Sequence, residues 1–130
     1  EFFKCGGVKS GPDNGVEEFA MNYAREKLRD QCQNIVPVDK RNFGYDLDAE
    51  DRAGNKMHIE VKGLSSERDV ELTGNETNAA DKHKDNFYLC VVSGIPETPV
   101  RYMVRNPAAP GIGKKDKLTI PVNVWKTSGR

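Results

Sequence analysis

Two carboxylates and one ammonium group lie in the stretch GYDLDAEDRAGNKMHIEVK, residues 44–62, where Asp46 precedes a turn and Glu60-Val61-Lys62 follows it. Hard cations such as Mg²⁺ prefer oxygen ligands, which the two carboxylates and the Val61 carbonyl can supply. The Lys62 ammonium can orient a water molecule or neutralise charge that develops on a phosphorus centre. These groups predict metal-dependent phosphodiester cleavage. Alternating acids are also typical of a solvent-facing strand, so the spacing alone leaves that alternative open.

A β-hairpin would hold these groups in place. Apolar and polar residues alternate over 45–50 and over 57–62, which indicates two half-buried strands joined by a turn at 51–55, where Gly54 or Asn55 takes positive φ. A symmetric turn pairs Glu50 with Lys56, Asp48 with His58, and Asp46 with Glu60. Facing residues share one side of the sheet, so Asp46, Glu60 and Lys62 would lie together. The alternating apolar set, Tyr45, Leu47, Ala49, Met57, Ile59 and Val61, would face the other way.

An amphipathic helix is expected over about 14–30. One apolar face repeats at helical spacing, and Asp13 or Asn14 can cap the start; the face consists of Val16, Phe19, Ala20, Tyr23 and Ala24. Glu17 borders that face. An acid near a helix start is commonly solvated and interacts favourably with the helix dipole. That role and a place in the active site are equally open for Glu17.

The remaining pattern predicts a mixed α/β fold in which helices cover a small central sheet. Strands are expected at 35–38, 87–92, 100–104 and 118–124, an extended piece at 70–72, and a helix at about 74–84 after the capping box Thr73 to Glu76. The apolar run 87–92 should be buried on both faces. Pro37 and Pro121 favour strand ends or edges. The length of 130 residues predicts a single domain over 1–130.

Composition narrows the class of protein. The chain has 20 basic and 20 acidic residues and no net charge, which argues against gripping nucleic acid by bulk charge alone. No apolar run reaches the roughly 18 residues of a membrane span. Cys5, Cys32 and Cys90 have no metal-ligand or disulfide spacing, which favours a reducing, intracellular compartment. The start at Glu1, without Met or signal peptide, favours a fragment of a longer protein.

The histidines and a lysine-containing loop indicate contacts with substrate or nucleic acid less strongly. His58 either contacts substrate or is an exposed strand residue, and His83 is expected at a helix end. The loop at 106–117 contains lysines that could contact a nucleic-acid backbone, although a solvated basic loop is commoner; they are Lys114, Lys115 and Lys117. Residues 1–14 lack periodicity and are expected to form a loop.

The order Glu17, Asp46, Glu60-Val61-Lys62 resembles the PD-(D/E)XK nuclease superfamily, the fold of restriction enzymes and many repair nucleases. A longer set of segments resembles the domain at the C-terminus of the plant protein NO VEIN, which also occurs in bacterial proteins beside helicase or restriction-type modules. These segments are GVEEFAMNYA, GYDLDAEDRAGNKMHIEVKG, VELTGNETNAA and NFYLCVV. The resemblance covers a core of about 14–107, followed by a strand extension at 108–130. Tyr45 replaces the Pro that usually precedes the first Asp.

This resemblance implies a restriction-endonuclease-like fold with a divalent-metal site. Asp46 and Glu60 would bind Mg²⁺ or Mn²⁺ together with the Val61 carbonyl, Lys62 would assist the attacking water, and Glu17 would reach the metal through water. A polar residue of the next helix, Asn75 or Glu76, would lie near the site.

We therefore expect a metal-dependent DNA endonuclease, the cleavage module of a restriction or genome-defence protein. One alternative is a non-catalytic nuclease-fold module for nucleic-acid binding or protein scaffolding, and another is an RNA-directed or repair nuclease. The expected partners are DNA, helicase or recognition domains in the same polypeptide or complex, and a second copy in a homodimer. We expect no interaction with a membrane. The expected location is intracellular, in the cytoplasm of a bacterium or the nucleus of a eukaryote.

Overall fold

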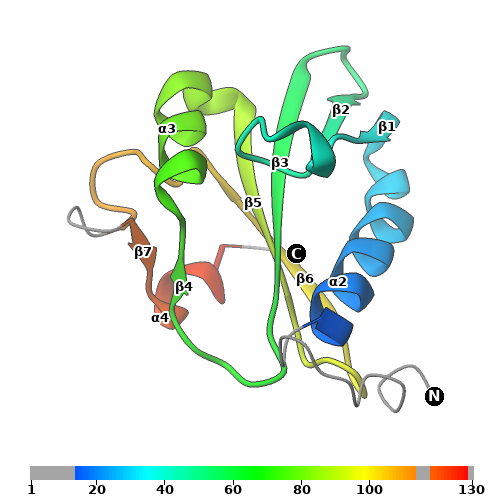
Figure 1. The fold of residues 1–130 in the computed structure, drawn as a ribbon, viewed down its shortest axis with the longest axis vertical. Helices are drawn as coiled ribbons and strands as arrows, with labels where there is room; N and C mark the ends of the chain where they lie inside the picture. Colours follow the sequence, from blue (N-terminus) through cyan, green and yellow to red (C-terminus); the bar gives the residue numbers. More distant parts are fainter. Residues whose placement is uncertain (1–13, 114–117, 129–130) are drawn as a thin grey trace.

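A five-stranded mixed sheet lies between two helical layers in the computed structural model, which describes residues 14–113 and 118–128 (Figure 1). The strand order is β1-β2-β3-β5-β6. The strands are β1 Cys32–Pro37, β2 Leu47–Asp51, β3 Lys56–Gly63, β5 Phe87–Ser93 and β6 Val100–Arg105. β3 and β5 run parallel, and the other neighbours are antiparallel. The predicted mixed α/β class is confirmed.

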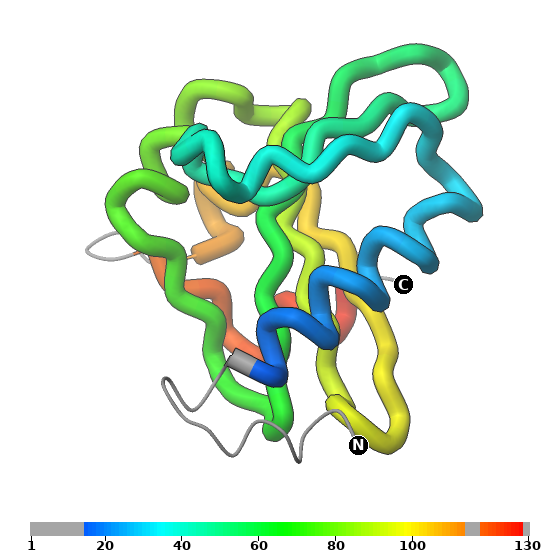
Figure 2. Tube along the Cα trace, turned by 45° about the vertical axis from the view of Figure 1, so that its right-hand side comes forward, coloured from blue at the N-terminus to red at the C-terminus, as the bar shows by residue number. Residues whose placement is uncertain are grey.

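Helix α2, Asn14–Lys27, continues as a 3₁₀ turn over Leu28–Asp30, as the periodicity predicted. Its buried face packs on the sheet through Ala20, Ala24 and Leu28. The approach is close, because a Cβ on Gly63 would lie only 2.6 Å from the Cβ of Ala20. Figure 2 shows α2 crossing in front of the central strands. The small residues therefore bring the start of α2 against the end of β3.

The hairpin follows the predicted register, with Gly54 at φ +89° in its turn. Glu50 pairs with Lys56, Asp48 with His58, and the ladder ends where Leu47 pairs with Ile59. Asp46 lies just outside the ladder, although its N–H still donates to the Ile59 carbonyl at 2.9 Å.

Tyr45 departs from the expected alternation. It was expected to face the same way as Leu47, but its ring lies 4.8 Å from that of His58, in the core on the other side of the sheet. The regular alternation stops because the ladder ends at Leu47 and Gly44 turns the chain at φ +92°.

The second helical layer covers the opposite face of the sheet. Helix α3, Gly74–His83, begins with the predicted capping box of Thr73 and Glu76 and ends at His83. Alternate residues of β5 supply both cores, with Phe87, Leu89 and Val91 on the α3 side and Cys90 and Val92 on the α2 side. The strand is thus buried on both faces, as predicted.

The predicted last strand at 118–124 is mostly wrong. Only Thr119–Ile120 forms a strand, β7, and it pairs with β4, Val70–Glu71, in a separate two-stranded sheet. After Pro121 the chain forms the short helix α4, Val122–Trp125. The Asp69 carboxylate accepts the Val122 N–H at 3.0 Å, which satisfies a donor at the helix start.

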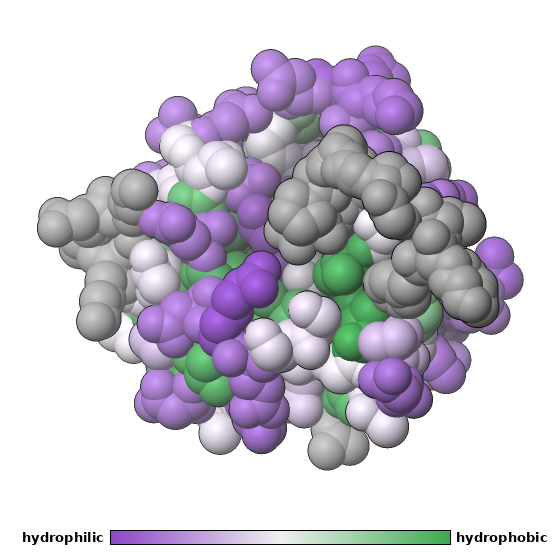
Figure 3. All heavy atoms as spheres, turned by 60° about the horizontal axis from the view of Figure 1, so that its bottom comes forward, coloured by the Kyte–Doolittle hydropathy of each residue, from purple (hydrophilic) through white to green (hydrophobic). Residues whose placement is uncertain are grey.

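The predictions for Pro37 and for two of the three cysteines can be compared with the structure. Pro37 ends the edge strand β1, and Cys32 and Cys90 are buried free thiols. Some predictions fall outside the described residues. They are the predictions for residues 1–13, including Cys5 and Asp13, and for Lys114, Lys115 and Lys117. Among the helices of the described ranges, none is long and apolar enough to cross a membrane. On the face drawn in Figure 3, hydrophobic residues show mainly in hollows between hydrophilic ones.

Candidate functional site

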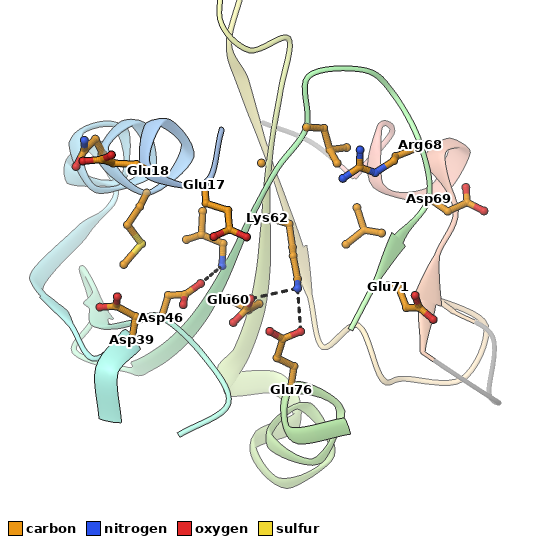
Figure 4. Close-up of a pocket in the computed structure, with 16 residues that line it drawn as sticks. Glu17, Glu18, Asp39, Asp46, Glu60, Lys62, Arg68, Asp69, Glu71 and Glu76 are labelled. Atoms are coloured by element: carbon orange, nitrogen blue, oxygen red, sulfur yellow. Dashed lines mark hydrogen bonds and ion pairs between the residues drawn. The ribbon is translucent and has the colours of Figure 1, made fainter. Parts of the chain in front are cut away.

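A cleft of about 750 Å³ opens between α2, the end of β3 and the start of α3 (Figure 4). β2 stops pairing at Leu47, whereas β3 continues to Gly63, so the last part of β3 lies beyond the hairpin ladder. The cleft is lined by Glu17, Glu18, Met21, Asn22, Asp39, Asp46, Glu60, Val61, Lys62, Gly63, Leu64, Arg68, Asp69, Val70, Glu71 and Glu76. All the predicted site residues are among them: Glu17, Asp46, Glu60, Val61 and Lys62.

Asp46 is held in place by the strand that carries Glu60. Its Oδ2 accepts the Val61 N–H at 2.8 Å, across the point where the hairpin ladder has ended. Burial raises the pKa of Asp46; the hydrogen bond from Val61 opposes this shift, and the nearby Glu76 adds to it. The hydrogen bond therefore orients the carboxylate in the cleft, while burial disfavours its ionised form.

Glu60 is a buried acid with only 4% of its surface exposed. Burial, followed by the negative charges of Asp46 and Glu76, raises the pKa of Glu60 to about 10, although Lys62 acts in the opposite direction. Without a bound cation, Glu60 thus holds a proton at neutral pH. A group this costly to bury indicates a site shaped for something other than stability.

Lys62 lies between two acids. Its Nζ is 2.9 Å from Glu76 Oε1 and 3.6 Å from Glu60 Oε2. Burial lowers the pKa of Lys62, but the attraction of Glu60 and Glu76 is stronger and the net shift is upward. Lys62 is therefore an ammonium at neutral pH, able to donate hydrogen bonds and not to accept a proton.

Glu76 lines the cleft, whereas Asn75 lies outside it. Burial raises the pKa of Glu76, but hydrogen bonds from the Thr73 N–H and from Lys62 outweigh it, and the net shift is downward. Glu76 is therefore ionised. Its spacing after Thr73 identified it as a capping residue, and only the resemblance suggested that it approaches the site.

Arg68 is the residue that sequence reasoning missed. It lines the cleft from the loop between β3 and β4, and with Lys62 it supplies the only cations among the described lining residues. The indole Nε1 of Trp125 donates to the Arg68 carbonyl at 3.0 Å, so α4 anchors this loop. No local pattern could reveal Arg68, because its anchor lies far along the chain.

His58 is neither exposed nor in the cleft. Its Nδ1 lies 2.8 Å from Asp48 Oδ1, and its side chain is 16% exposed. The ring also lies 4.0 Å from that of His83. The structure therefore assigns His58 to an aromatic cluster beside Tyr45 and does not support a substrate contact in the cleft.

The donor set fits a hard divalent cation held by few protein ligands. Among the described residues, no group of three or more His, Cys, Asp or Glu side chains could hold a metal. Asp46 and Glu60 nevertheless both line the cleft, and the pKa of each is raised first by burial and then by neighbouring negative charge, both of which a bound cation would offset. Mg²⁺ typically binds through one or two carboxylates and completes its shell with water and substrate phosphate. Two carboxylates suffice for that mode.

Comparison with known proteins agrees with this architecture. No curated protein matches the chain in sequence. The structure is similar to that of Hjc, a Holliday junction resolvase from the archaeal hyperthermophile Archaeoglobus fulgidus, with a TM-score of 0.61 and 13% identity over 88% of this chain and 94% of the resolvase chain. At this identity the likeness shows the fold alone, and it confirms the predicted restriction-endonuclease-like, PD-(D/E)XK nuclease fold.

The family described as "Protein NO VEIN, C-terminal" matches residues 16–104. That segment contains all but the first two residues of α2, the hairpin, α3 and β5, and hence all the predicted site residues. Since it spans more than half of the sequence, the chain belongs to the NO VEIN C-terminal family.

Proposed function

We propose that this domain is a nuclease that hydrolyses DNA phosphodiester bonds with Mg²⁺ or Mn²⁺. The observation that carries the proposal is the meeting of Asp46, Glu60 and Lys62 in one cleft of a resolvase-like fold. The raised pKa values of the two acids support a cation there, and the name of the structural relative supports DNA as the substrate class.

Each predicted site residue has a proposed part. Asp46 and Glu60 hold the ion, with the Val61 carbonyl as a further oxygen, and the Val61 N–H keeps Asp46 oriented. The ion, when bound, would polarise the phosphate and lower the pKa of a water molecule. Lys62 donates a hydrogen bond to the attacking water or to a phosphate oxygen, and its fixed positive charge stabilises the transition state. Glu17, which points toward the cleft in Figure 4, orients a second water.

Arg68 is proposed to bind a non-bridging phosphate oxygen. The cleft has an excess of acids, so a phosphate entering it needs more positive charge than Lys62 supplies, particularly since Lys62 already contacts Glu76. Arginine binds phosphate through a planar fork of donors. Arg68 reaches the cleft from the side opposite to α2 (Figure 4).

We further propose that the domain is the cleavage module of a restriction or genome-defence protein. The neutral chain and acidic cleft supply little attraction for DNA, which supports recognition or helicase domains elsewhere in the same protein or complex. Cutting both strands would need two sites, which supports a homodimer.

The second candidate is a nuclease-fold module that binds nucleic acid or scaffolds proteins without turnover. The observation that favours it is the lack of a group of three potential metal ligands within the described parts of the chain. If two carboxylates hold the ion too weakly for turnover, nucleic acid binds in the cleft and is not cut, so this candidate predicts binding without cleavage.

Cleavage of plasmid and oligonucleotide DNA, with RNA in parallel, separates these candidates. With Mg²⁺ or Mn²⁺ we expect cutting that EDTA abolishes and that falls by about 10²–10³-fold in Asp46→Ala and Lys62→Ala. Glu50→Ala is the matched control, since Glu50 is an acid of the same hairpin outside the cleft. Cleavage that survives both cleft substitutions would contradict the mechanism. DNA binding without metal-dependent cutting would favour the second candidate, and cutting of RNA alone would change the substrate class.

A further inference from the structure

A second, smaller pocket of about 230 Å³ differs from the cleft in its chemistry. Its walls are aromatic rings, amides and an ammonium group, supplied chiefly by Phe43, Tyr45, Asn75, Asn78, Lys82 and His83. Among the described residues that line it there is no Asp or Glu, whereas acids predominate in the cleft. A pocket with flat apolar walls, amide groups and positive charge fits a planar heterocycle attached to a phosphate chain.

The two pockets are adjacent. Tyr45 lines the small pocket and the next residue, Asp46, lines the cleft. On α3, Asn75 lines the small pocket and the next residue, Glu76, lines the cleft. Consecutive residues have Cα atoms about 3.8 Å apart, so the two pockets open on neighbouring parts of the surface, where the segment before β2 meets the start of α3.

Phe43 forms an exposed aromatic wall of the small pocket. Its surface is 44% exposed, which is unusual for a large apolar side chain, whereas neighbouring Tyr45 is 8% exposed. The ring of Phe43 lies 5.9 Å from that of Tyr45, and the Arg41 guanidinium lies 5.4 Å from the Phe43 ring centre. An exposed ring beside a guanidinium is a combination on which nucleobases stack.

The wall is held in position before any ligand arrives. Gly44 at φ +92° lets the chain press against α3, since a Cβ there would lie 2.6 Å from the Asn75 carbonyl oxygen. The Asn75 amide also donates to Asn42 Oδ1 at 3.2 Å. In Figures 1 and 2 the segment before β2 lies beside α3, in agreement with these contacts. Such preorganisation lowers the entropic cost of binding.

We propose that the small pocket binds an unpaired nucleobase next to the scissile phosphate, with Phe43 as its stacking surface. The inference rests on the proposed function, because it takes the DNA strand to run through the neighbouring cleft. It narrows the substrate class to DNA with an unstacked base at the cleavage position, such as a single strand, a bulge or a branch. Arg41, which lies over the Phe43 ring, and Lys82, which lines the pocket, would contact the flanking phosphates.

Binding of 2-aminopurine DNA tests the proposal independently of cleavage. The probe is a single-stranded oligonucleotide with phosphorothioate linkages, which resist hydrolysis, and its fluorescence falls when 2-aminopurine stacks. With wild-type protein and Mg²⁺ we expect quenching on binding. Phe43→Ala should weaken binding by about 5- to 100-fold and remove the quench, whereas Phe43→Trp should keep both. Val36→Ala is the matched control, because Val36 is 50% exposed and lines neither pocket.

The competing outcomes are distinct. The base pocket would be overturned if the wild-type protein gave no quenching, or if the quenching persisted in Phe43→Ala. It would also be overturned if Phe43→Ala weakened binding of a fully paired duplex as much as binding of the single strand. A pocket that instead takes an aromatic side chain of a partner protein would leave the 2-aminopurine signal unchanged. Quenching that depends on Phe43 in a protein that cuts no DNA would support the pocket and refute the proposed nuclease activity.

Discussion

The Lys62 ammonium lies 2.9 Å from the Glu76 carboxylate, although Lys62 belongs to a central strand and Glu76 to the first turn of α3. The same Glu76 oxygen accepts the Thr73 N–H at 2.9 Å. One carboxylate therefore caps a helix and holds the positive charge of the cleft. The stability of α3 and the electrostatics of the site are coupled through this residue.

Glu76→Gln should separate the two tasks of Glu76. Glutamine preserves the capping box, so the melting temperature should change little. Loss of the negative charge should lower the pKa of Lys62 and reduce DNA cleavage about tenfold, because a charge-assisted hydrogen bond is lost. Glu76→Ala should in addition destabilise the fold by about 1 kcal/mol. The pH profile of cleavage and thermal unfolding measure both effects, and equal activity of wild type and Glu76→Gln would refute the coupling.

Glu60 should make the metal-free protein less stable as pH rises. Its pKa is raised from 4.5 to about 10 on folding, mainly by burial, so between these values the folded state binds more protons than the unfolded state. The free energy of unfolding therefore falls across that window, by at most about 1.4 kcal/mol per pH unit. Thermal unfolding in EDTA at pH 5, 7 and 9 should show a steeper decline for wild type than for Glu60→Gln. Glu50→Gln, outside the cleft, should behave like wild type.

Arg68→Ala should reduce cleavage by about 10- to 100-fold with little effect on stability, because its proposed role is phosphate binding through an exposed loop.

Trp125→Phe should act on the same residue indirectly, since it removes the indole donor to the Arg68 carbonyl. We expect it to destabilise the fold by about 1–3 kcal/mol and to raise KM. Urea unfolding and steady-state kinetics measure the two variants, and a Trp125→Phe protein with unchanged KM would contradict the anchoring role of α4.

Gly44→Ala should destabilise the protein more than Gly54→Ala. Both glycines have positive φ, near +90°, which costs other residues about 1–3 kcal/mol. A Cβ on Gly44 would also meet α3, at 2.8 Å from the Ala79 Cβ, whereas a Cβ on Gly54 would meet nothing within 4 Å. Urea midpoints compare the pair. Equal losses would show that the chain at Gly44 does not press on the helix.

Local pattern determined much of the fold and part of the site. The hairpin register follows from a strict two-residue alternation around a glycine turn, and it brings Asp46 next to Glu60 because the two are close in sequence. The amphipathic α2 and the Thr73 capping box are likewise local, and both formed where predicted. Such features depend on backbone geometry and side-chain period within one or two elements.

Tertiary packing decided the rest. The end of the ladder and the turn at Gly44 moved Tyr45 to the other core, and Pro121 starts a helix that brings Trp125 to Arg68. The proton on Glu60 depends on its burial and on two acids from other segments, Asp46 and Glu76. The sequence by itself determined which groups could do the chemistry and that Asp46 and Glu60 would meet. Only the tertiary structure decided which cations and carboxylates surround them, because contacts between distant segments depend on how the whole core packs.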